Sequence, residues 1–296
     1  GVLDRASTFA DPEIVKLLQT SFVPVAIDQA YQRRQQDTEG DFYRKIAGQG
    51  PRKDFSGTTQ GLYIATASGK LLSYNNNRGA DRIRRLMKEA LDAPQPRDVA
   101  PVSDPTRDIR HNPRPPEGGL VVRVRARVLG GYKDTTNRWR RIFQTAISRD
   151  NLWISKEEHQ ALAHGDVPVS LQKRIARFHL VDNTRGEPPM WREEEIRHIN
   201  MKIVDGKLRG AVLLKTDDNQ RGYQAEMLGD VKVENNKVVA VDIIALGDFW
   251  GEGPYTSGAP EGKFPLAISF ALADGSDVAD EIPPQGSRGW VQGYIR

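Results

Sequence analysis

A proline-rich stretch divides this chain into two parts, and each part must build a hydrophobic core of its own. Residues 93–118 read APQPRDVAPVSDPTRDIRHNPRPPEG, hold seven prolines and carry few apolar side chains. Such a composition favours an extended linker, because proline can neither continue a helix nor donate a sheet hydrogen bond. The sequence therefore predicts a domain over residues 1–92, a linker over 93–118 and a second domain over 119–296.

The first domain begins with a helix signal and a strand signal. Asp11 is an acidic N-cap, Pro12 occupies the first helical position and Glu13 lies in the first turn. Apolar residues then recur at helical spacing. Residues 22–27 (FVPVAI) form an apolar, β-branched run that predicts a buried strand.

A hairpin and a helix complete the first domain. Residues 62–65 and 71–74 are predicted strands around a turn at 67–70, and residues 78–91 have the pattern of an amphipathic helix. The order helix, strand, helix, hairpin, helix over residues 8–92 resembles a thioredoxin-like domain without its first strand. The resemblance implies that the absent strand belongs at the centre of the sheet, between 22–27 and 62–65.

A central position in a sheet cannot stay empty, because unpaired amide and carbonyl groups of both neighbours would be buried at a cost. Residues upstream of Gly1 supply the strand, another segment fills its place, or 22–27 and 62–65 pair directly. Residues 120–129 are the best donor by length and β-branching. Their arginines count against them, since helices cover both faces of such a sheet.

The resemblance does not extend to redox chemistry. Thioredoxin-like domains carry a Cys-x-x-Cys pair before a helix of the type seen at Thr8–Pro12, and a cis-proline after a Gly-Thr. This chain contains no cysteine, and Thr59 stands where the proline would be, after Gly57 and Thr58. We expect a redox-inactive module that offers a groove around Thr58 and Thr59 to a peptide segment or to the second domain. The alternative is a thiol-disulfide oxidoreductase whose active cysteines lie upstream of Gly1 or were removed.

Alternating residues predict a mainly antiparallel β second domain. Residues 120–129 alternate small apolar residues with three arginines, which gives a strand with one apolar and one arginine face. Two hairpins follow, turning at Asp205–Gly206 and Asn235–Asn236, and residues 264–272 form a last strand. The fold class is thus α+β: a thioredoxin-like α/β domain followed by a β-rich domain of sandwich or barrel type.

Two shorter elements are also predicted in the second domain. Residues 142–147 have the composition of a short strand. Ser155 and Glu158 have the spacing of a capping box, which indicates a helix that ends near Ala163.

Three groups of polar residues in this domain are typical of structure rather than chemistry. The arginine face of 120–129 lacks the interleaved aromatic residues of single-strand nucleic-acid binders, so we expect it to pair with acidic strands. The glutamates after Trp191 (Glu193–Glu195) offer a general acid if the tryptophan raises a carboxyl pKa. Arginines flank them, however, which favours a salt-bridged edge. The histidines lack metal-ligand spacing, so no metal or cofactor is predicted.

The best candidate site in the sequence is the glycine- and proline-rich stretch 245–266 (ALGDFWGEGPYTSGAPEGKFPL). Irregular segments of this length are often functional. Its candidate binding residues are Asp248, Phe249, Trp250, Glu252 and Tyr255. The competing interpretation is a packed loop that covers a barrel end or sheet edge.

Composition limits the remaining choices. A hydrophobic content of 38% with 28% charged residues is typical of a globular protein with a sizeable core. No apolar run approaches the ~18 residues of a membrane span, and a net charge of +4 is too small to indicate nucleic acid. We therefore expect a binding or structural module with a protein or peptide partner, and an extracytoplasmic or periplasmic location. An enzyme of unknown class using 245–266 is the further alternative.

Overall fold

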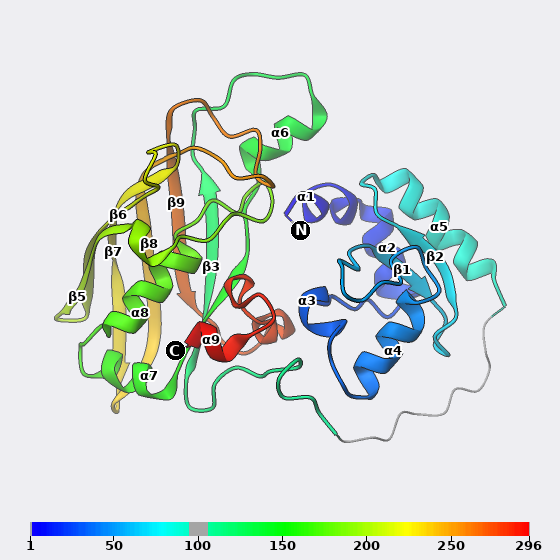
Figure 1. The fold of residues 1–296 in the computed structure, drawn as a ribbon, viewed down its shortest axis with the longest axis horizontal. Coiled ribbons are helices and arrows are strands. Elements are labelled where there is room, and N and C mark those ends of the chain that lie inside the picture. The colour runs from blue at the N-terminus through cyan, green and yellow to red at the C-terminus, as the bar shows by residue number, and fades with distance from the viewer. Residues whose placement is uncertain (1, 95–105, 296) are drawn as a thin grey trace. The chain divides into compact units, whose positions relative to one another are not determined.

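The computed structural model describes residues 2–94 and 106–295 and divides them into two compact units (Figure 1). The N-terminal unit comprises residues 4–94, 106–114 and 288–290. The C-terminal unit comprises residues 2–3, 115–287 and 291–295. Residues 95–105, the middle of the predicted linker, lie outside the described residues. The chain mixes helix and strand, as the sequence predicts.

Short helices and one hairpin make up the first part of the chain. Its elements are α1 (Val2–Arg5), the 3-10 turn η1 (Thr8–Ala10), α2 (Pro12–Thr20), α3 (Gln29–Gln32), α4 (Thr38–Ala47), β1 (Leu62–Ala65), β2 (Leu71–Asn75) and α5 (Ala80–Asp92). The predicted N-cap of α2 is present. Asp11 Oδ1 accepts hydrogen bonds from the amides of Glu13 and Ile14, both at 3.1 Å.

A small apolar core holds the N-terminal unit together. Ile14 of α2 packs with Ile83 and Met87 of α5, and Leu62 and Ile64 of β1 border this cluster. β1 and β2 pair as the predicted antiparallel hairpin. Helices α2 and α5 contact each other, and α5 also contacts both strands.

Segment 22–27 is not the buried strand that its composition predicts. It forms no helix or strand and pairs with no other segment, and Val23 is 89% exposed and Val25 73% exposed. Within the described residues β1 pairs with β2 alone, so 22–27 and 62–65 do not pair directly. Composition favours a strand here, but a strand also needs a partner edge, and this part of the chain supplies none. The thioredoxin-like resemblance therefore stays a proposal.

The last part of the predicted linker is folded onto the N-terminal unit. Asp108 Oδ2 accepts the amide of Gln36 at 2.7 Å, and the Asp108 amide donates to Asp37 Oδ2 at 2.9 Å. Asn112 Nδ2 donates to Glu39 Oε2 at 3.0 Å. Residues 107–112 are therefore fixed against the start of α4 rather than extended.

The C-terminal unit is built on one curled antiparallel sheet of seven strands, in the order β4-β3-β9-β8-β7-β6-β5. Its elements are β3 (Leu120–Val128), α6 (Arg138–Thr145), β4 (Asp150–Ile154), α7 (Lys156–Ala163), α8 (Val169–Arg174), the π-helical turn η2 (Ile175–His179), η3 (Glu193–Glu195), β5 (Ile196–Val204), β6 (Lys207–Lys215), β7 (Gly222–Glu234), β8 (Lys237–Trp250), β9 (Lys263–Leu272), η4 (Val278–Glu281), η5 (Gln285–Ser287) and α9 (Val291–Ile295). A single sheet replaces the two sheets of the expected sandwich. Its end strands β4 and β5 do not pair with each other, so the sheet is not the expected closed barrel either.

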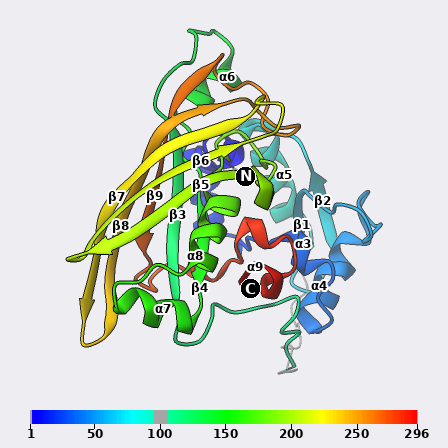
Figure 2. The ribbon, with the colours of Figure 1, turned by 60° about the vertical axis from the view of Figure 1, so that its left-hand side comes forward.

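The two faces of this sheet differ in chemistry. The inner face is apolar, and α7 and α8 lie over it (Figure 2). Leu162 of α7 and Leu171 of α8 belong to the same core cluster as the inward residues of the strands. The outer face carries the three arginines of β3, as the alternation predicts.

Two predicted strands have other roles. Residues 138–145 form helix α6 where a strand was expected at 142–147, because Asn137 caps a helix: its Oδ1 accepts the amides of Trp139 and Arg140. Residues 120–129, the proposed donor to the first domain, pair with β4 and β9 in the C-terminal sheet. Both predicted hairpin turns and the capping box of Ser155 and Glu158 are confirmed.

Candidate binding sites

The predicted loop 245–266 is shorter than its sequence indicates, and its candidate residues do not converge. β8 continues to Trp250 and β9 begins at Lys263, so three of the five candidates lie in a strand. Asp248 is exposed on the outer face, whereas Phe249 is buried in the core against Tyr223 and Phe264.

The remaining residues of this stretch hold its own conformation. Trp250 Nε1 donates to the carbonyl of Asn219 at 3.0 Å. Glu252 Oε2 accepts the amides of Gly258 and Ala259 at 2.7 and 3.1 Å. Tyr255 is 76% exposed. These contacts favour the interpretation of 251–262 as a packed structural loop.

Thr58 and Thr59 also differ in their surroundings. Thr58 is exposed, and its Oγ1 accepts the amide of Gln60 at 3.3 Å. Thr59 is buried: its amide donates to Gln29 Oε1 at 3.1 Å, and its Oγ1 accepts the Tyr43 hydroxyl at 2.6 Å. Burial raises the pKa of Tyr43. Of the two threonines, only Thr58 is placed to touch a ligand directly.

His179 and the glutamates after Trp191 make contacts that are typical of structural residues. His179 belongs to the turn η2 and lies between Asp150 (Nδ1 to Oδ2, 3.1 Å) and the Tyr294 hydroxyl (Nε2 to Oη, 2.5 Å). His179 Nδ1 makes no hydrogen bond within the described residues, and His179 and Tyr294 are each only 2% exposed, which is typical of a structural role. Glu193 and Glu194 form exposed salt bridges, as expected. They pair with basic residues outside β3.

Segment 22–27 is the most unusual surface of the N-terminal unit. Within the described residues none of its backbone amides or carbonyls makes a hydrogen bond. Val23, Val25 and Ile27 are large exposed apolar residues. In an extended chain, alternate residues direct their amides and carbonyls to the same edge. In such a conformation residues 23, 25 and 27 would present one complete hydrogen-bonding edge, while Pro24 would leave a missing donor on the other.

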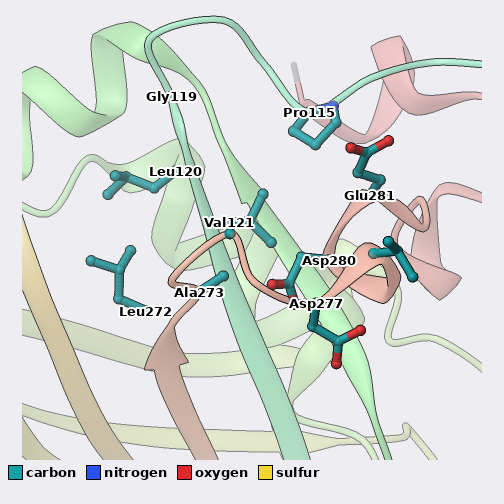
Figure 3. A pocket seen from close by; sticks show the side chains of 11 residues that line it. Pro115, Gly119, Leu120, Val121, Leu272, Ala273, Asp277, Asp280 and Glu281 are labelled. Carbon is teal, nitrogen blue, oxygen red and sulfur yellow. The ribbon is translucent and has the colours of Figure 1, made fainter.

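The C-terminal unit contains an open cavity of about 330 Å³ beside the start of β3 (Figure 3). Leu120 and Val121 of β3 and Leu272 and Ala273 at the end of β9 form its apolar side. Residues 275–281, including the turn η4, form the opposite wall. The sequence analysis predicts no site here, although the acidic run after the last strand (DGSDVADE) contributes residues to the cavity wall.

Arginines neutralise most of the acidic groups at this cavity. Arg123 binds both oxygens of buried Asp280, at 2.8 and 2.7 Å, and also contacts Asp274 at 2.6 Å. Arg149 bridges Asp280 and Asp277 at 2.9 and 2.7 Å. The hydrogen bonds to Asp280 and Asp274 raise the pKa of Arg123, and the hydrogen bond from Arg149 lowers the pKa of Asp277.

Glu281 completes the rim of the cavity. It is exposed and has no ion pair within the described residues. The cavity thus offers an apolar wall and one free carboxylate. No histidine, cysteine or serine lines it.

Neither a metal centre nor a membrane helix is found in the part of the chain that the structure describes. Residues 2–94 and 106–295 hold no group of three or more histidine, aspartate or glutamate residues placed to bind a metal ion. No helix within these ranges is both long enough and apolar enough to cross a bilayer. No protein-family model, curated protein or solved structure matches the chain.

Proposed function

We propose that this chain is a redox-inactive polypeptide-binding module whose N-terminal unit takes up an extended strand alongside segment 22–27. The observation that carries the proposal is that this segment has exposed apolar side chains and a backbone that pairs with no strand. Main-chain pairing of this kind gives affinity through amide and carbonyl groups, and side chains add selectivity. A thioredoxin-like arrangement would place the incoming strand between 22–27 and β1.

The chemistry of the segment defines the ligand. Val23 and Val25 are β-branched and uncharged, so the bound strand should also be apolar and rich in β-branched residues. Pro24 directs pairing to the edge formed by residues 23, 25 and 27. The absence of cysteine from the sequence supports capture of the strand without thiol exchange.

Two proline substitutions test this proposal. Val25→Pro removes an amide from the binding edge, and Ala26→Pro removes one from the opposite edge, which already lacks the donor of Pro24. The probe is a capped peptide of alternating valine and threonine with terminal lysines, titrated against the whole chain by calorimetry. A second probe has the same side chains and N-methyl groups on alternate amides.

We expect Val25→Pro to weaken binding of the unmodified peptide at least about fivefold, because the lost main-chain hydrogen bond contributes ~1 kcal/mol and the proline ring also obstructs the incoming strand. Ala26→Pro should leave binding within about twofold, because it changes only the opposite edge. The N-methylated peptide should bind poorly to every variant. Equal losses in the two proline variants, or equal binding of the two peptides, would show that apolar contact rather than strand pairing is responsible.

A further inference from the structure

The arginines of the C-terminal unit, apart from Arg209 of β6, fall into two groups. One group forms ion pairs with aspartate or glutamate: Arg123, Arg149, Arg174, Arg177, Arg185, Arg192, Arg197 and Arg221. The other group consists of Arg125 and Arg127 of β3 together with Arg138, Arg140 and Arg141 of α6, and we call it the arginine cluster. Each member is exposed and has no ion pair within the described residues.

Contacts between β3 and the chain after α6 bring the two parts of the cluster together. Helix α6 contacts β3. Immediately after the helix, the Ser148 amide donates to the Ala126 carbonyl at 2.9 Å, and Ser148 Oγ accepts the Ala126 amide at 2.8 Å. Ala126 lies between Arg125 and Arg127 in sequence. Figure 1 shows α6 beyond the end of β3, away from α7 and α8.

The helix turns its cationic side outward. Trp139, Ile142 and Phe143 are half-buried and share one side of α6, whereas Arg140 and Arg141 project from the other. The Arg138 guanidinium lies 5.4 Å from the centre of the Trp139 ring. The cationic side of α6 is therefore free for an external anion.

No acidic residue forms an ion pair with the cluster within the described residues. Glu261 is engaged by Lys133 at 2.7 Å. Asp134 is exposed, and it is the acidic residue nearest the cluster in sequence. Two exposed apolar residues border the cluster as well: Leu129, 52% exposed at the end of β3, and Ile147, 49% exposed just after α6.

We propose that the arginine cluster is a docking surface for an anionic phospholipid membrane. Arginine binds phosphate groups through paired N–H donors, and several basic residues acting together attract a protein to a negatively charged bilayer. Leu129 and Ile147 would add apolar contact at the level of the headgroups. Nucleic acid fits less well, because base stacking needs open aromatic faces and Arg138 lies over the ring of Trp139.

Co-sedimentation of the whole chain with lipid vesicles tests this surface. One set of vesicles is pure phosphatidylcholine and the other contains equal parts of phosphatidylcholine and phosphatidylglycerol. We expect binding to the anionic vesicles alone, with loss at high salt because of charge screening. The triple variant R138Q/R140Q/R141Q should reduce the partition coefficient by roughly a hundredfold, at about fivefold for each arginine.

Arg209→Gln is the matched control. Arg209 is also exposed and has no ion pair within the described residues, but it lies on β6, outside the cluster. It should leave the partition coefficient within about twofold, whereas the single cluster variant R140Q should lower it about fivefold. Circular dichroism should show all variants folded. Equal binding to both vesicle types, an unaffected triple variant, or binding of poly-glutamate without binding of vesicles would overturn the proposal.

Discussion

Arg174 and Glu158 form a two-pronged buried ion pair, with Nη1–Oε2 at 2.6 Å and Nη2–Oε1 at 2.9 Å. Glu158 also accepts the Ser155 amide at 3.1 Å and so caps α7. Arg174, at the end of α8, donates to the carbonyls of Trp153 and Tyr294 at 3.3 and 2.8 Å. One pair thus joins α7, α8, β4 and the terminal helix α9.

Removing one member of this pair should destabilise the C-terminal unit strongly. Arg174→Met leaves a carboxylate buried without its partner, and such changes cost about 3–5 kcal/mol. The double variant R174M/E158Q should lose less than the sum of the two single losses, because the uncompensated charge is gone. Urea unfolding, followed by the fluorescence of buried Trp153 and Trp191, measures the free energy of unfolding of the parent, the two single variants and the double variant. Strictly additive losses would contradict direct coupling.

Asp37 and Asp108 should make the N-terminal unit sensitive to acid. Burial by itself raises the pKa of each carboxyl, but backbone amide hydrogen bonds and those from Gln35 and His111 outweigh it, so both pKa values lie below the usual range. The stabilisation is therefore complete above about pH 4 and is lost as pH falls through the lowered values.

Urea titrations at a series of pH values below 5 measure this dependence. Asp108→Asn cannot ionise, so the variant should be less stable at neutral pH and should show a shallower decline on acidification. An unchanged slope in this variant would assign the acid sensitivity to other carboxyls.

Thr58 and Thr59 should respond differently to the same substitution. Thr59→Val leaves the buried Tyr43 hydroxyl without its acceptor and should cost about 1–3 kcal/mol of unfolding free energy. Thr58→Val changes an exposed side chain and should stay within about 0.5 kcal/mol. Thermal unfolding of the two variants, followed by circular dichroism, makes the comparison. A larger loss of unfolding free energy for Thr58→Val than for Thr59→Val would contradict the buried hydrogen bond between Tyr43 and Thr59.

Local signals in the sequence predict much of this fold. Asp11 caps α2, Ser155 and Glu158 form a capping box, and Asp205–Gly206 turns a hairpin, because each signal depends on a few neighbouring residues. The prediction of a strand at 142–147 is wrong because Asn137, upstream of that segment, caps helix α6.

Long-range packing explains why the loop predicted at 245–266 is partly strand and why the cavity was not predicted. Gly247 belongs to strand β8 rather than a loop: a side chain there would lie 2.0 Å from the Gln224 carbonyl of the neighbouring strand. The glycine reflects close approach of two backbones, which composition does not separate from flexibility. The cavity beside Leu120 and Ala273 joins segments about 150 residues apart, so no local pattern reveals it.

Val23 and Val25 should contribute almost nothing to the stability of the chain on its own. Their side chains are 89% and 73% exposed, so folding removes little of their apolar surface from water. The double variant V23T/V25T should therefore unfold within about 0.5 kcal/mol of the parent, as surface substitutions do. In a buried strand, each added hydroxyl would instead cost about 1–3 kcal/mol. Ile14→Thr, at a fully buried position of α2, is the control that should lose at least about 2 kcal/mol. Urea unfolding monitored by circular dichroism compares the three chains, and a loss in V23T/V25T as large as that of Ile14→Thr would mean that segment 22–27 is packed inside the isolated chain.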